Sequence, residues 1–81
     1  MARVDVVWED EAGTSHTSRG TIEDISDRGL GIRVNDHIPL GSKIVVRWRH
    51  DNISGVVVQS RQIGQNCILG IKRDAAQNSQ N

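Results

Sequence analysis

Apolar and polar residues alternate along most of this chain, and this alternation constrains its fold more than any other feature. Residues 43–50 show it best, because Ile44, Val46 and Trp48 alternate with residues on the opposite face that include two arginines. A period of two is typical of a β-strand with one buried face. No helical period persists, and most apolar residues are valine or isoleucine, which favour strands. The sequence therefore predicts an all-β fold.

Six strands joined by short polar turns are predicted from this pattern. They are expected at residues 3–9, 16–25, 29–34, 43–50, 53–62 and 67–72. Connections of hairpin length join antiparallel strands, and a small sheet leaves exposed edges unless it closes on itself. We therefore expect a small six-stranded antiparallel β-barrel.

Two local features follow from the same pattern. The segment 16–25 has little apolar character before Ile22, so we expect it to be a solvated edge strand. The pair Asp51-Asn52 is of the type that forms tight turns between antiparallel strands, so we expect a turn there. Both tryptophans, Trp8 and Trp48, are interpreted as core side chains.

The length of 81 residues fits a single domain. We expect the barrel to occupy residues 1–73 and the polar segment 74–81 to be a disordered tail. We expect neither a signal peptide nor membrane insertion, because the apolar runs are only a few residues long. The single cysteine, Cys67, excludes an internal disulfide, which is typical of a cytoplasmic protein.

Charge and aromatic content argue against a nucleic-acid partner. Ten basic and ten acidic side chains give a net charge of zero, and two tryptophans are the only aromatic residues among Phe, Tyr and Trp. Nucleic-acid-binding domains usually carry a basic surface or aromatic side chains for base stacking. One cysteine and three histidines offer no metal-site spacing, and no nucleophile–base pair is visible. We therefore expect no enzymatic activity, no catalytic residues, no metal and no cofactor.

Residues 24–29 (Asp-Ile-Ser-Asp-Arg-Gly) lie at the predicted turn between the second and third strands. Asp24 can accept two hydrogen bonds in one plane, Ser26 can donate or accept, and Gly29 lets the backbone turn or approach closely. This combination suits recognition of the edge of a small polar ligand. The same residue types also cap ordinary hairpin turns through their own backbone. Taken alone, these residues favour the turn and leave the ligand role open.

Residues 19–32 resemble the hallmark segment of PilZ domains, whose motif is Asp or Asn, any residue, Ser, two residues and Gly. The similarity extends over residues 3–73, through Leu40-Gly41, a valine-rich fifth strand and the closing Leu69-Gly70-Ile71. It implies a PilZ-like split barrel of six strands that binds the bacterial second messenger cyclic di-GMP. It also implies a signal passed to a partner protein or an attached effector domain.

The resemblance assigns roles to particular residues. In PilZ domains the Asp and Ser of this motif contact guanine and the Gly shapes the turn, roles that fall here on Asp24, Ser26 and Gly29. A second motif, Arg, three residues and Arg, precedes the first strand, and its guanidiniums hold phosphate and stack on guanine. Arg3 occupies the second position of that motif, and the first would lie ahead of Met1, outside the given sequence. The implied ligand-binding set is Arg3, Asp24, Ser26 and Gly29.

Two functions remain open from the sequence. The leading one is a cyclic di-GMP sensor or adaptor domain. The alternative is a ligand-free PilZ-like protein-interaction module, which the partial arginine motif supports and in which Arg47 and Arg49 would contact a partner. Arg19 and Arg28 flank the motif and are candidates for phosphate contacts, although exposed arginine on an edge strand is the simpler interpretation.

Overall fold

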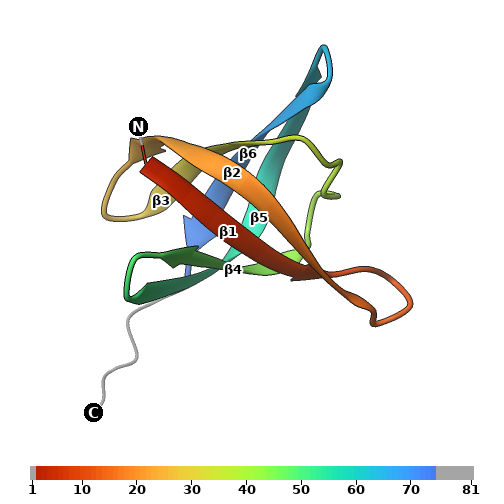
Figure 1. The fold of residues 1–81 in the computed structure, drawn as a ribbon, viewed down its shortest axis with the longest axis horizontal. Helices are drawn as coiled ribbons and strands as arrows, with labels where there is room; N and C mark the ends of the chain where they lie inside the picture. Colours follow the sequence, from red (N-terminus) through yellow and green to blue (C-terminus); the bar gives the residue numbers. More distant parts are fainter. Residues whose placement is uncertain (1, 75–81) are drawn as a thin grey trace.

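A computed structural model describes residues 2–74 as a closed barrel of six antiparallel strands (Figure 1). The strands are β1 (Ala2–Glu9), β2 (Ser15–Ile25), β3 (Gly29–Val34), β4 (Lys43–Trp48), β5 (Asp51–Ile63) and β6 (Asn66–Arg73). The predicted all-β class and the six-stranded antiparallel barrel are confirmed. The predicted tail lies outside the described residues, except for Asp74. No helix capable of spanning a membrane occurs in the described part of the chain.

The strands follow the order β1-β2-β3-β6-β5-β4 around the barrel, and β4 pairs with β1 to close it. In Figure 1, β1 and β2 cross in front of the other strands. Because the sheet closes, β2 pairs with β1 on one side and with β3 on the other. The prediction of a solvated edge strand at 16–25 is therefore wrong. The strand is polar because its outer face meets solvent, whereas its backbone pairs with β1 along Ser15–Ile22 and with β3 between Gly20 and Ile25.

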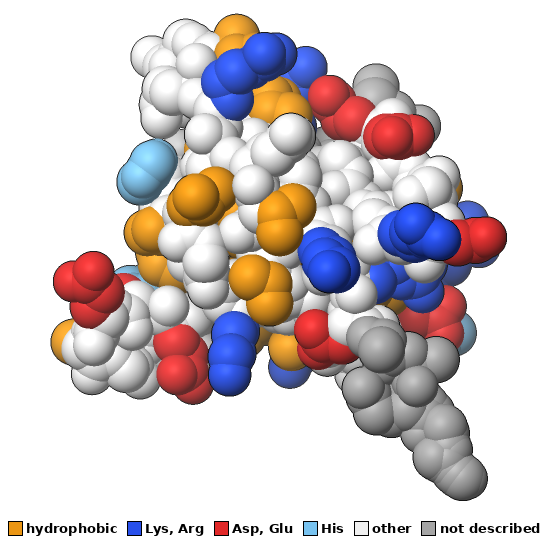
Figure 2. Space-filling view, turned by 180° about the vertical axis from the view of Figure 1, so that it is seen from behind, with side chains coloured by type: hydrophobic (Ala, Val, Ile, Leu, Met, Phe, Trp, Pro, Cys, Tyr) orange, Lys and Arg blue, Asp and Glu red, His pale blue; other side chains and the backbone are white. Residues whose placement is uncertain are grey.

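The inward-facing side chains of the strands form one hydrophobic core. It contains Val4, Val6, Ile22, Leu30, Ile32, Val34, Ile44, Val46, Val57, Cys67, Leu69 and Ile71, with Ile38 added from the β3–β4 loop. Complete burial of aliphatic side chains of this kind is the main source of stability in a small domain. Among the described residues, the exposed large hydrophobic side chains are Ile25, Leu40, Val58 and Ile63. Figure 2 shows one face of the molecule, where hydrophobic side chains lie near its middle and charged ones mostly around them.

Both tryptophans differ from the prediction, because each is only partly buried and packs against the edge of the core. Trp8 directs its indole Nε1–H toward Ser18 Oγ at 3.0 Å, and its ring stacks on His16 with the ring centroids 4.6 Å apart. Ser18 is 3% exposed and in turn donates a short hydrogen bond to the Asp36 carboxylate. An indole needs a partner for its N–H when that group leaves water. Trp8 therefore lies at the rim of the barrel, where the Ser18 hydroxyl accepts this hydrogen bond.

The turn between β4 and β5 lies at Arg49-His50, two residues earlier than the predicted Asp51-Asn52. Trp48 pairs with Asp51 and Arg47 with Asn52, so both residues of the predicted turn belong to β5. Arg49 adopts a positive φ of 59°, as the first central residue of one class of two-residue hairpin turn must. Sequence preference favoured Asp and Asn for this role, but the register of the barrel assigns it to an arginine.

Candidate ligand-binding site

Residues 24–29 form the hairpin that joins β2 to β3, as the sequence predicted. The backbone N–H of Ser26 donates to the Gly29 carbonyl at 2.9 Å, and the Gly29 N–H donates to Ser26 Oγ at 3.2 Å. The guanidinium of Arg73 adds a hydrogen bond to the Ser26 carbonyl at 3.3 Å. Ser26 therefore has the turn-capping role that the sequence left open, and its exposed hydroxyl still has capacity for a further partner.

Gly29 is required by the close approach of two strands. A Cβ atom at this position would lie 2.7 Å from the Ile71 carbonyl oxygen of β6. That distance is too short for any side chain without a backbone shift. Its φ is not positive, unlike those of Gly13, Gly41 and Gly64. Gly29 thus sets how closely β3 and β6 pack beneath the motif.

Asp24 differs from Ser26, because nothing in the described residues engages its carboxylate in a hydrogen bond or an ion pair. A β-bulge interrupts the pairing of β2 with β3 between Ile22 and Asp24, after which Asp24 lies opposite Gly31. Bulges commonly re-aim a side chain next to a functional site. Here the bulge leaves an exposed carboxylate on the outer face of the barrel with its acceptor sites free.

Two paired glycines form a flat strip beside Asp24. Gly31 of β3 pairs with Gly70 of β6, and Gly70 pairs with Gln59 of β5. A Cβ atom on Gly31 would lie 3.4 Å from the Asp24 Cβ, and one on Gly70 would lie 3.0 Å from the Gln59 Cβ. A second bulge, between Val57 and Gln59, sets the position of Gln59. Two glycines without side chains, bordered by a carboxylate and an amide, leave room for a planar group against the backbone.

The sequence did not identify Gln59 or the strip as functional. The available signal was the repeated Leu-Gly-Ile, at Leu30-Gly31-Ile32 and Leu69-Gly70-Ile71. It places a glycine on the outer face of each strand. That the two glycines are neighbours depends on the pairing of β3 with β6, which the alternation of residues does not reveal.

Arg3 projects outward from β1, opposite Thr21 of β2. It lines a cleft of about 800 Å³ that four further arginines, Arg19, Arg33, Arg47 and Arg49, also line. We call this group of five the arginine cleft. Asp24 lies three residues beyond Thr21 along β2, so the hairpin motif and Arg3 occupy adjoining parts of one outer face. The structure thus brings Asp24, Ser26 and Gly29 together in one hairpin and places Arg3 in the neighbouring cleft.

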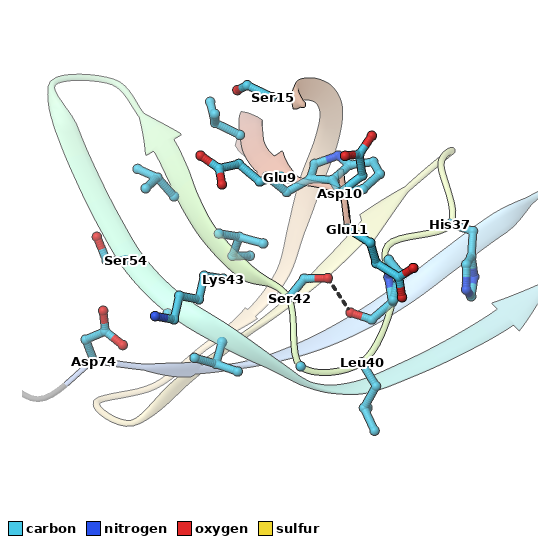
Figure 3. A pocket seen from close by; sticks show the side chains of 18 of the residues that line it. Glu9, Asp10, Glu11, Ser15, His37, Leu40, Ser42, Lys43, Ser54 and Asp74 are labelled. Atoms are coloured by element: carbon cyan, nitrogen blue, oxygen red, sulfur yellow. Dashed lines mark hydrogen bonds between the residues drawn. The ribbon is translucent and has the colours of Figure 1, made fainter. Parts of the chain in front are cut away.

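A larger groove of about 1120 Å³ lies at another part of the barrel, between β1, the β3–β4 loop, β4 and β5. Figure 3 shows Glu9, Asp10 and Glu11 on one side of it, with Lys43 across from them and the exposed Leu40 near the loop. None of the four predicted ligand-binding residues lines this groove. The predicted ligand-binding residues therefore lie at the hairpin and the arginine cleft, away from this groove.

The closed antiparallel barrel and its exposed hairpin motif define a small all-β domain whose candidate site lies on the outer wall. A family model for the PilZ domain matches residues 2–80, nearly the whole chain. The chain therefore belongs to the PilZ domain family, as the resemblance of residues 19–32 predicted. This is a family of cyclic di-GMP receptor domains. Searches of curated proteins and of solved structures returned no match.

Proposed function

We propose that this chain is a bacterial cyclic di-GMP-binding domain that relays the second-messenger signal to a partner protein or an attached effector domain. The observation that carries the proposal is the free carboxylate of Asp24 beside the Gly31–Gly70 strip. We further propose that the domain works in the cytoplasm by binding alone, without catalysis and without a cofactor.

The chemistry of guanine fits this arrangement. The Watson–Crick edge of guanine presents an N–H and an amino group side by side, and an ionised carboxylate accepts both as a pair. With that edge at Asp24, the flat base lies along the two glycines toward Gln59. The exposed Ser26 hydroxyl stands in the same hairpin as a further partner for the base. Membership of the PilZ family supports the same ligand.

Removal of the Asp24 carboxylate tests the proposal directly. Hydrogen bonds to a charged group contribute about 1.5–3 kcal/mol, so Asp24→Ala should weaken cyclic di-GMP binding by about 10- to 150-fold. Isothermal titration of the unmodified chain and the variant with cyclic di-GMP measures this. Asp27→Ala is the matched control, because Asp27 is an exposed carboxylate in the same turn. It should bind within about twofold of the unmodified chain.

Two results would contradict the proposal. One is an absence of measurable binding by the unmodified chain and by a longer version that carries the residues upstream of Met1. The other is binding by Asp24→Ala that equals that of Asp27→Ala. In either case the protein-interaction module becomes the better description, and a charge reversal at Arg47 or Arg49 should then disrupt partner binding while Asp24→Ala leaves it intact.

A further inference from the structure

The arginine cleft consists of two neighbouring rows of outward-facing residues that cross four strands. The first row runs from Arg3 on β1 through its partner Thr21 on β2 to Arg33 on β3. Asp5, two residues after Arg3, begins the second row, with Arg19 on β2 as its partner on one side and Arg47 on β4 on the other. Arg49 lies two residues after Arg47, in the turn that follows β4, and lines the same cleft. The side chains of all five arginines therefore project from one continuous patch of the outer barrel wall.

Charge is concentrated in this patch. The whole chain has a net charge of zero, yet five of its ten basic side chains line the cleft, with Asp5 as the only acidic residue among them. Arg33 forms an ion pair with Glu23, with Nε and Oε2 2.7 Å apart. In the described part of the chain, no salt bridge engages Arg3, Arg19, Arg47 or Arg49. Five arginines with one acidic residue among them leave an excess of positive charge on this patch, which favours an anion that comes from outside the barrel.

The backbone positions from which the five arginines project are set by the barrel itself, before any anion binds. Four of the five arginines project from paired strands rather than loops. Arg49, in the turn, has its guanidinium over the Trp48 ring, 5.6 Å from the ring centroid. Its φ of 59° is a left-handed conformation that costs a residue with a Cβ about 1–2 kcal/mol. The register of the β4–β5 hairpin sets this conformation, so Arg49 has a fixed backbone position at the cleft.

The distance between the cleft and the guanine position suits a nucleotide. Arg33 lies two residues after Gly31 on β3, which separates their positions by about 7 Å along the strand. A guanine beside Asp24 would therefore lie within the length of one nucleotide of the first row of arginines. A guanidinium presents a planar fork of donors that matches phosphate oxygens.

We propose that the arginine cleft receives the phosphodiester groups of cyclic di-GMP, with Arg19 on β2 and Arg47 on β4 as phosphate ligands alongside Arg3. This inference rests on the proposed function. It places the phosphate-binding part of the site on the outer wall of the barrel. There, β1 and β4 contact the ligand in addition to the β2–β3 hairpin.

The experiment compares the unmodified chain with the double variant Arg19→Gln and Arg47→Gln by isothermal titration with cyclic di-GMP, at about 50 mM and about 300 mM NaCl. The double variant should bind at least about 10-fold more weakly at the lower salt concentration, and its affinity should depend less on salt. Arg61→Gln is the matched control, because Arg61 is an exposed arginine of β5 outside the cleft, and its binding should match that of the unmodified chain. Circular dichroism spectra confirm that each variant is folded.

Asp24→Ala separates this inference from the proposed function. It should weaken binding at both salt concentrations without changing the salt dependence, because the phosphate contacts remain. If Asp24→Ala weakens binding while the double variant matches the unmodified chain at both concentrations, the phosphate assignment is overturned and the proposed function stands. An equal loss in Arg61→Gln also overturns it, since overall charge would then explain the effect. Absence of binding by both the unmodified chain and the longer version overturns both proposals.

A second readout tests the cleft without guanine. Inorganic pyrophosphate at millimolar concentration should raise the thermal midpoint of the unmodified chain and of Arg61→Gln, and should raise that of the double variant less. Equal shifts in all three proteins would overturn the assignment of the phosphates to the cleft.

Discussion

Asp10 shows how one side chain fixes a turn of this barrel. Its Oδ1 accepts the backbone N–H of Ala12 at 2.9 Å and that of Thr14 at 3.0 Å, and its Oδ2 lies 2.8 Å from His16 Nε2. The hydrogen bond with His16, followed by the one from Thr14, holds the pKa of the Asp10 carboxyl below its ordinary value of 3.8. The ionised carboxylate therefore joins the end of β1 to the start of β2.

This lowered pKa makes the contribution of Asp10 to stability depend on pH. The native state favours the ionised form, so the contribution is complete above the ordinary value of 3.8 and is lost as the pH falls through the lower native pKa. Asp10→Asn lacks the charge at every pH. The difference in thermal midpoint between the unmodified chain and Asp10→Asn should therefore be largest near neutral pH and shrink below about pH 3.8. Thermal unfolding at about pH 7, 5 and 3 measures it.

Glu11→Gln is the control for this effect, because Glu11 is exposed in the same turn. Its midpoint should follow that of the unmodified chain at every pH. A difference between the unmodified chain and Asp10→Asn that stays constant from neutral to acidic pH would show that the charge of Asp10 has no part in the turn.

Among the strands, β5 is the one whose packing depends most on a single glycine. Gly55 is buried between Ile44 of β4 and Arg73 of β6. A Cβ atom there would lie 2.5 Å from the Lys72 carbonyl oxygen and 2.7 Å from Ile71 Cγ2. Since a backbone carbonyl cannot rotate away as a side chain does, Gly55→Ala must push β5 and β6 apart.

We expect Gly55→Ala to lower the free energy of unfolding by about 1–3 kcal/mol, as overpacking of a tight interior does. Urea unfolding monitored by circular dichroism measures the change. Ser54→Ala is the control, since Ser54 is the exposed neighbour of Gly55 on the same strand, and it should change stability by less than about 0.5 kcal/mol. Equal effects of the two substitutions would show that β5 and β6 tolerate separation.

The strands themselves were largely predictable from the sequence. Each strand buries one face, and the alternation of apolar and polar residues shows which side chains lie on that face. The third strand was predicted with its observed bounds, Gly29–Val34. The features that deviate from alternation were not predictable. The bulges that position Asp24 and Gln59 each insert one residue, and the turn at Arg49 uses a residue that turn preferences disfavour. In each case the register of a neighbouring strand overrides the local preference.

On the scale of the whole molecule, closure of the barrel determines which residues meet. The motif at Asp24, Ser26 and Gly29 is contiguous in the chain, so the sequence located that part of the candidate site. The arginine cleft is assembled from four strands, and Arg47 reaches Arg3 and Asp5 only because β4 pairs with β1. Alternation indicates that a side chain faces outward, but it does not indicate which other strand lies beside it. The sequence therefore showed separate arginines where the structure has one cleft.

Concentrating positive charge in this way has a consequence for stability that can be measured without a ligand. Arg3 on β1 and Arg49 in the turn after β4 line the same cleft. Like charges on the same face of a sheet destabilise it by about 0.2–1 kcal/mol. Arg3→Gln should therefore raise the thermal midpoint of the ligand-free protein by about 1–8 °C at low salt. The gain should disappear at about 0.5 M NaCl, which screens surface charges. Arg61→Gln, outside the cleft, should leave the midpoint unchanged. A midpoint that falls in Arg3→Gln would show that Arg3 stabilises the ligand-free protein, so that its charge is balanced within the cleft. A midpoint that rises while cyclic di-GMP binding weakens would show that the protein gives up some stability to bind its ligand, as binding sites commonly do.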